Sequence, residues 1–190
     1  QKEAEALIEA ARAALLANPL LDFDQLLVLR RTLDPKKARQ EMGRDTGFIS
    51  LNAHNHSDIR RNGWNNDIAR VSNLRGTPKV ETVYRPADDG IIRDIELDFD
   101  AQHLLFTGLN ANKRLALFEC KPDGSGLAEV TPATYADLDW FDGCYLPDGR
   151  IVMLGTAAYQ GLPCENGSMP MAVLYQLDRK TGAIRQLTFE

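Results

Sequence analysis

Two short segments of the chain, Ile91–Leu97 and Leu138–Cys144, carry or adjoin a concentration of carboxylates. The carboxylates are Asp94, Glu96, Asp98, Asp139 and Asp142. Carboxylate oxygens ligate hard cations, and a ring of them attracts a cationic ligand. We therefore predict that these side chains line a ligand-binding channel. The alternative is that they cap turns and strand ends by accepting hydrogen bonds from backbone amides, which is the commoner use of Asp.

The candidate metal ligands are Cys144, Asp94, His54 and His56. Cys144 ends the second acidic segment, where its thiolate could ligate a soft metal; the alternative is a small buried apolar residue. His54 and His56 are two residues apart in a polar stretch, which suits either a metal pair or a solvated loop. Cys164 lies in a Gly- and Pro-containing segment, as half of a disulfide or as an exposed thiol.

Motifs of complete active sites are absent from the sequence. There is no CxxC or CxxCH, and the three cysteines are widely spaced, so no zinc ribbon or attached haem is predicted within this segment. There is also no nucleophile elbow, phosphate loop, dinucleotide fingerprint or zincin motif. The sequence alone therefore predicts no complete catalytic site and no cofactor bound within these residues.

The elements that would position the carboxylates form an internal repeat, residues 91–131 and 138–188. In each copy an acidic segment is followed by a turn, an apolar strand, a third strand, a Gly-containing hairpin and a short closing strand. The apolar strands are Leu104–Gly108 and Ile151–Gly155, the third strands are Leu115–Phe118 and Ala172–Tyr175, and the hairpins are centred on Gly124 and Gly182. Four strands in a unit of about 40–45 residues are typical of a propeller blade.

The repeat predicts an all-β fold, a partial β-propeller of about three four-stranded blades. We place the blades at about 25–86, 91–131 and 138–189, the first being the most divergent. Because closed propellers have about 4–8 blades, three would leave sheet edges and faces open. We expect the remaining blades to lie beyond Glu190 or in another chain, which would then be a partner.

Residues 1–24 are predicted to be a short N-terminal helix and a linker. Apolar residues recur at helical spacing over 3–17, and Asn18-Pro19 ends the pattern because proline cannot continue the hydrogen-bond ladder. The net charge of −5 argues against nucleic acid as a partner. No apolar run approaches the roughly 20 residues of a membrane span.

The sequence resembles a known group of repeats at 139–152 (DWFDGCYLPDGRIV) and at 174–189. These segments are similar to TolB-type propeller repeats, and more narrowly to the hydrazine synthase alpha-subunit-like proteins of bacteria. The narrower resemblance is carried by Gly-Cys-Tyr-Leu-Pro-Asp-Gly-Arg at 143–150 and Gly-Leu-Pro-Cys at 161–164. The likeness covers about residues 25–190.

The resemblance implies an exported protein of the periplasm or cell surface. In hydrazine synthase the alpha subunit carries c-type haems and a zinc ion, so it implies haem c or zinc elsewhere in a longer polypeptide. A family pattern Asp-x-Asp-Leu-His stands here as Asp94-Ile95-Glu96-Leu97-Asp98, without the histidine. That departure weakens a transfer of the metal chemistry to this chain.

Two functions follow as expectations. The first is a binding or scaffolding propeller for a small molecule or a protein, with the ligand at the channel mouth or on long loops. The second is the propeller portion of a haem- or metal-dependent redox enzyme subunit. A propeller hydrolase is a third possibility and would need catalytic residues outside this segment.

Overall fold

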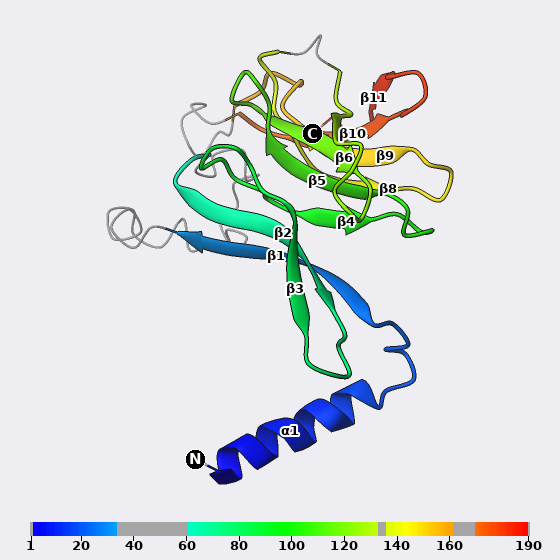
Figure 1. The fold of residues 1–190 in the computed structure, drawn as a ribbon. Coiled ribbons are helices and arrows are strands. Elements are labelled where there is room, and N and C mark those ends of the chain that lie inside the picture. Colours follow the sequence, from blue (N-terminus) through cyan, green and yellow to red (C-terminus); the bar gives the residue numbers. More distant parts are fainter. Residues whose placement is uncertain (1, 34–60, 133–135, 162–169, 190) are drawn as a thin grey trace.

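The computed structural model describes residues 2–33, 61–132, 136–161 and 170–189. These residues form one N-terminal helix and three antiparallel sheets, so the protein is mostly β (Figure 1). Sheet A has the order β1-β2-β3, sheet B the order β4-β5-β6-β7, and sheet C the order β11-β10-β9-β8. None of the described helices is long and apolar enough to cross a bilayer.

The predicted repeat is confirmed as two meandering sheets of four strands each. The strands of sheet B are β4 (Ile95–Leu97), β5 (Leu104–Leu109), β6 (Leu115–Cys120) and β7 (Ala128–Glu129). Those of sheet C are β8 (Trp140–Tyr145), β9 (Ile151–Gly155), β10 (Val173–Leu177) and β11 (Ile184–Gln186). The acidic segments thus begin two different sheets, and the first of them is a strand only from Ile95 onward.

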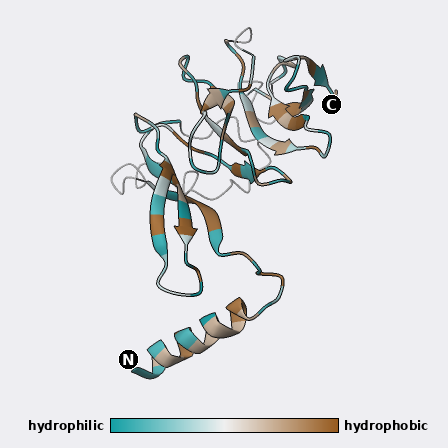
Figure 2. Cartoon of the chain, turned by 45° about the vertical axis from the view of Figure 1, so that its right-hand side comes forward, coloured by the Kyte–Doolittle hydropathy of each residue, from teal (hydrophilic) through white to brown (hydrophobic). Residues whose placement is uncertain are grey.

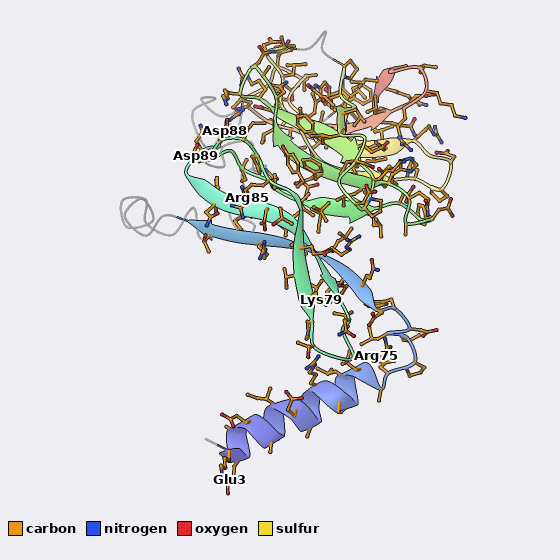
Figure 3. The ribbon with its side chains drawn as sticks, viewed as in Figure 1. Glu3, Arg75, Lys79, Arg85, Asp88 and Asp89 are labelled. Atoms are coloured by element: carbon orange, nitrogen blue, oxygen red, sulfur yellow. The ribbon has the colours of Figure 1, made fainter. Side chains whose placement is uncertain are left out.

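Sheet A differs from the four-stranded prediction because it has three strands among the described residues. They are β1 (Gln25–Leu33), β2 (Trp64–Ser72) and β3 (Lys79–Tyr84). The β2–β3 hairpin extends away from the other sheets toward the helix (Figure 1). Arg75 lies at its tip (Figure 3), where the guanidinium donates to the carbonyls of Leu21 and Phe23 and so fixes the linker.

The helix α1 (Lys2–Leu16) confirms the N-terminal prediction within one residue at each end. It has no buried residue, and Leu7, Ile8 and Leu15 are each more than 60% exposed. Figure 2 shows it lying apart from the sheets. Arg12 connects it to the β2–β3 hairpin by donating to the carbonyls of Leu74 and Gly76.

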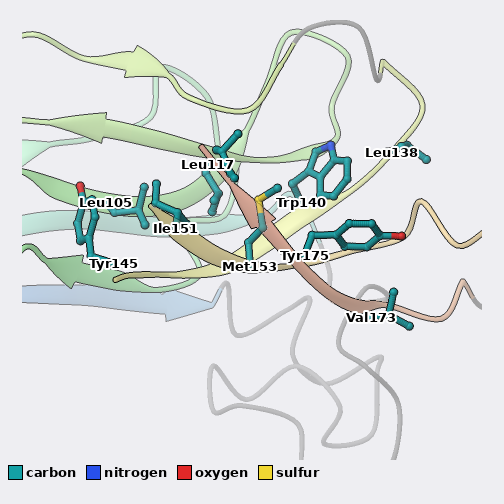
Figure 4. Close-up of a cluster of buried hydrophobic side chains, with 10 residues drawn as sticks. Leu105, Leu117, Leu138, Trp140, Tyr145, Ile151, Met153, Val173 and Tyr175 are labelled. Atoms are coloured by element: carbon teal, nitrogen blue, oxygen red, sulfur yellow. The ribbon is translucent and has the colours of Figure 1, made fainter. Parts of the chain in front are cut away.

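Apolar side chains pack the three sheets face to face. Between A and B, Ile68 meets Leu104 and Phe106, and Leu27 and Leu29 pack beside them. Between B and C, Leu105 and Leu117 meet a layer from sheet C (Figure 4). That layer is Trp140, Tyr145, Ile151, Met153, Val173, Tyr175 and Leu177. Burial of these side chains removes large apolar areas from water, which is the main stabilising contribution to such a stack.

Candidate functional site

The five predicted carboxylates do not form one ring in the structure but occupy four kinds of environment. Asp139 lies in a buried ion-pair network, Asp98 caps a turn, and Glu96 is exposed on β4. Asp94 and Asp142 come together at the junction of sheets B and C. The structure therefore distinguishes Asp94 and Asp142, which could bind a ligand, from Asp139 and Asp98, which stabilise the fold.

Asp139 immediately precedes β8 and is 1% exposed. Its two oxygens accept hydrogen bonds from both terminal nitrogens of Arg61, each at 2.8 Å, and from the backbone N–H of Leu115 at 2.9 Å. Arg114 approaches at 3.5 Å. A buried carboxylate with these partners connects the segment before β2 to sheets B and C, so its role here is structural.

Asp67 in β2 has a similar environment that the sequence analysis missed. It is 1% exposed and accepts from Arg30 at 2.7 and 2.6 Å, from Arg85 at 2.7 Å and from the hydroxyl of Thr82 at 3.0 Å. The bond from Arg30 is the main cause of a lowered pKa of Asp67. Asp67 therefore stays ionised and cross-links the three strands of sheet A.

Asp98 has the turn-capping role. Its Oδ1 accepts from the backbone N–H of Gln102 at 2.7 Å and of His103 at 3.0 Å, and its Oδ2 lies 2.7 Å from His103 Nδ1. Burial alone would raise the pKa of Asp98, but the bonds from His103 and Gln102 outweigh it and lower that pKa. These contacts bear out the capping alternative for this residue.

The carboxylate cluster consists of Asp94, Asp142, Arg93, Thr107 and Arg31, drawn from all three sheets. Asp142 accepts from Arg93 Nε at 2.7 Å and Nη2 at 2.8 Å, and its own N–H donates to the Thr107 hydroxyl at 3.1 Å. Arg31 donates to the carbonyls of residues 92 and 93, both at 2.6 Å. The guanidinium of Arg93 also lies 4.5 Å from the centroid of the Phe141 ring, a cation–π contact.

A local irregularity of β8 aims Asp142 at the cluster. The pairing of β8 with β9 shifts register between Phe141 and Cys144, and Asp142 adopts a φ of 51°. A bulge of this kind re-aims a side chain and is common beside functional sites. The Asp142 side chain therefore points toward sheet B, where it pairs with Arg93.

Asp94 is the member of the cluster with unused bonding capacity. Its Oδ1 atom is buried and has no hydrogen-bond partner among the described residues. Burial raises the pKa of Asp94 from 3.8 to about 7, the charge of Asp142 adds to the rise, and a hydrogen bond with Thr107 opposes it. The Asp94 oxygen that has no hydrogen-bond partner lies near the paired carboxylate of Asp142. Such an oxygen can take up a proton or bind a cation or a hydrogen-bond donor of a ligand.

The raised pKa gives a testable pH dependence. Between about pH 4 and pH 7 the folded protein binds more protons at Asp94 than the unfolded chain does, so stability falls as pH rises through that window. Asp94→Asn should remove a dependence of roughly 2–4 kcal/mol and make the variant the more stable protein at pH 8. Urea unfolding at pH 4.5 and 8 measures it, with Asp100→Asn, an exposed carboxyl of the same sheet, as control. If the unfolding free energies of Asp94→Asn and of the parent changed equally between pH 4.5 and 8, the raised pKa of Asp94 would be contradicted.

The predicted metal ligands are only partly described. His54 and His56 lie outside the described residues, as does Cys164, for which the sequence predicts half of a disulfide or an exposed thiol. Cys144 is exposed on β8, and burial of its sulfur together with the charge of Glu96 raises its pKa. Within the described part of the chain no three His, Cys, Asp or Glu side chains are grouped closely enough to hold a metal ion.

A concave feature away from the carboxylate cluster, the rim groove, lies between sheets B and C and has a volume of about 670 Å³. Its acidic lining is Glu119, Glu129, Asp148 and Asp178, and its basic lining is Arg150, Arg179 and Lys180. Glu119 accepts from the Tyr145 hydroxyl at 2.8 Å and from Arg179 at 2.5 Å. Sequence reasoning missed the groove because its residues come from strands β6 and β7 of sheet B and from turns of sheet C, which only the stacking of the two sheets brings together.

Comparison with solved structures shows similarity of fold at low sequence identity. The AtxE2 isopeptidase S527A variant with bound Astexin3-dC4 has a TM-score of 0.50 and 15% identity over 88% of this chain. TolB proteins from Agrobacterium tumefaciens and Acinetobacter baumannii have TM-scores of 0.46 and 0.40, identities of 14% and 19%, and cover 65% and 66% of this chain. The matched parts are 28%, 38% and 27% of those chains, so this chain spans well under half of each. No protein-family model and no curated protein matches the sequence.

Proposed function

We propose that sheets A, B and C are consecutive blades of a β-propeller that further sheets complete, and that the protein is a binding or scaffolding module. The proposal rests on one observation: the surface by which sheet B contacts its neighbour recurs on sheet C, where the described residues leave it only partly covered. Leu105 and Leu117 of sheet B are fully buried. Their counterparts in the repeat are Val152, which is half-buried, and Leu174, which is 38% exposed.

Part of the contact that buries the sheet B surface is made by β8, the first strand of the next sheet. A Cβ atom at Gly143 would lie 2.8 Å from Leu117 Cδ1 and 2.9 Å from Leu105 Cδ2. The β8 backbone therefore passes directly over these leucines, and the glycine leaves room for them. The uncovered face of sheet C has the same apolar character, so the occupant that fits it is another first strand with a small residue at this point.

The carboxylate cluster is where we propose that a ligand meets the module. Asp94 directly precedes β4 and Asp142 lies within β8, and these first strands of sheets B and C contact each other. In a propeller the first strands surround the central channel, so a polar or cationic ligand in that channel would face Asp94. The unpartnered Oδ1 of Asp94 supports this placement over the other predicted carboxylates.

Location and cofactors are proposed from the resemblance alone. The likeness of residues 143–150 to hydrazine synthase alpha-like proteins supports export to the periplasm or cell surface. It also supports a second candidate function, a redox subunit whose haem or zinc is held by residues outside this segment. An absorbance band near about 400 nm in the polypeptide extended past Glu190 would favour the redox subunit over the binding module.

Labelling of Cys144 tests the proposed blade stacking. Cys144 pairs with Val152 and is exposed on the open face of sheet C, whereas Cys120 is buried. In a Cys164→Ser background we expect Cys144 of the 190-residue chain to react with a maleimide. In the polypeptide extended past Glu190 it should react at least about tenfold more slowly, because labelling would then require local opening. Equal rates in the two proteins would overturn the proposal, and Cys120 serves as the protected control in both.

A further inference from the structure

A pocket of about 260 Å³, the end pocket, lies between sheets B and C at the opposite ends of β6 and β9 from the rim groove. Its lining comes from the residue before β6, the segment before β8 and the segment after β9. It includes Arg114, Asp137, Leu138, Asp139, Thr156 and Tyr159. The pocket is slightly smaller than the roughly 300–1,000 Å³ typical of sites for drug-sized ligands, so it suits a smaller molecule.

The floor of the end pocket is buried, and its polar groups already have partners within the protein. Leu138, Asp139 and Thr156 are all buried. The Asp139 carboxylate accepts the two bonds from Arg61, and the Thr156 hydroxyl accepts from the backbone N–H of Asp139 at 3.0 Å. These bonds hold the floor in place without a ligand, as is usual for a binding site that is formed in advance.

Arg114 is the basic group of the end pocket, and most of its hydrogen-bonding capacity is unused. Its side chain is 39% exposed, and among the described residues its guanidinium makes one contact, a long bond of 3.5 Å from Nη1 to Asp139 Oδ2. Because Arg61 already donates two shorter bonds to Asp139, the charge of Arg114 is only weakly compensated. A guanidinium with spare donors can bind a carboxylate through two parallel hydrogen bonds.

Asp137 and Tyr159 supply an acidic and an aromatic group on the other side of the end pocket. The Tyr159 hydroxyl donates to Asp137 Oδ2 at 3.1 Å, whereas Asp137 Oδ1 accepts no hydrogen bond from the described residues. Tyr159 has a φ of 52°, and its N–H donates to the Thr156 carbonyl at 3.1 Å. Since Tyr159 is 72% exposed, its ring offers apolar surface to a ligand, and Asp137 keeps an oxygen for a cationic donor.

We propose that the end pocket binds a small zwitterion, a free amino acid with an apolar side chain. The ligand carboxylate pairs with Arg114, and the ligand ammonium group pairs with Asp137. The ligand side chain lies against Leu138 and the Tyr159 ring. A ligand with both charges is favoured over a simple anion or cation, because either of those would meet a like charge in the pocket. The end pocket is separate from the carboxylate cluster, so this inference goes beyond the proposed function and does not depend on it.

Titration of the 190-residue chain with L-valine, followed by protein NMR, tests the inference. Two analogues test the two charges separately, since N-acetyl-L-valine lacks the ammonium group and L-valinamide lacks the carboxylate. We expect L-valine to bind, and each analogue to bind at least about tenfold more weakly, because each loses one charge-assisted pair. Absence of L-valine binding up to about 10 mM, or equal affinity for either analogue, would overturn the inference.

Substitution of the two charged residues locates the binding in the end pocket. Arg114→Gln and Asp137→Asn each remove one charge while keeping a polar group, and each should weaken L-valine binding at least about tenfold. Both should leave the urea midpoint nearly unchanged, since exposed charges contribute little to stability. Arg185→Gln is the matched control, because Arg185 is an exposed arginine of β11 outside the pocket, and it should leave the affinity unchanged. Unchanged affinity in both pocket variants, or an equal loss in the control, would contradict the site.

Discussion

Replacing Asp139 with alanine is expected to cost about 3–5 kcal/mol of unfolding free energy, because it leaves a paired guanidinium without its buried partner. Arg61, whose side chain is 23% exposed, would lose two hydrogen bonds of 2.8 Å, and the buried N–H of Leu115 would lose its acceptor. Without these hydrogen bonds, Asp139 no longer connects the segment before β2 to both sheet B and sheet C. Urea unfolding followed by tryptophan fluorescence measures it.

Two controls separate the network from a general charge effect. Asp139→Asn keeps an acceptor for Leu115 and should lie between the parent and the alanine variant. Asp148→Ala removes the partner of Arg150 in an exposed ion pair and should leave the midpoint nearly unchanged, since exposed pairs contribute little. An Asp139→Ala midpoint equal to that of Asp148→Ala would contradict the structural role of Asp139.

The second large effect is expected at Gly155, at the centre of the core between sheets B and C. A Cβ atom there would lie 2.2 and 2.4 Å from the Trp140 ring, which packs edge-on against Tyr175 at 5.1 Å between centroids. Gly155→Ala should therefore destabilise the protein by about 1–3 kcal/mol, because the fully enclosed Trp140 ring has to move. The variant should also shift the emission of Trp140.

The repeat supplies a matched control for this substitution. Gly108 holds the same position in β5 as Gly155 in β9, but the nearest atoms to a Cβ atom there belong to Phe118 at 3.4 Å and Phe106 at 3.5 Å, which is ordinary van der Waals contact. Gly108→Ala should therefore be neutral or stabilising by up to about 1 kcal/mol, since alanine lowers the entropy of the unfolded chain. If the two alanine variants have equal stability, the described packing of Trp140 is wrong.

Local sequence patterns predicted the strands but not all of their bounds. Alternation, apolar runs and Gly hairpins located β5, β6, β9 and β10, because those signals are local. The predicted first strand Ile91–Leu97 shrank to Ile95–Leu97. The residues before Ile95 instead bond to other segments, as when Ile91 donates to the Arg61 carbonyl and Ile92 to Asn66 Oδ1. Such bonds depend on the stacking of sheets, which a local pattern does not contain.

The candidate site was predictable in composition but not in geometry. The acidic segments singled out Asp94 and Asp142, which the structure does bring together. Their partner Arg93 and the buried network of Asp139 with Arg61 were not predicted. The latter pair is 78 residues apart in the chain. A charged residue in a sequence is as compatible with an exposed side chain as with a buried ion pair. Only the fold therefore shows that Asp139 and Arg61 form a buried pair.

The central claim is that sheets B and C each present the same apolar surface to the following sheet, and that this surface is covered on sheet B and open on sheet C. A cryo-EM or crystal structure of the polypeptide extended past Glu190 tests this most directly. The account predicts a further sheet whose first strand crosses Val152 and Leu174 with a small residue over them, as Gly143 crosses Leu105 and Leu117. Solvent, or a helix, over Val152 and Leu174 in that structure would contradict it.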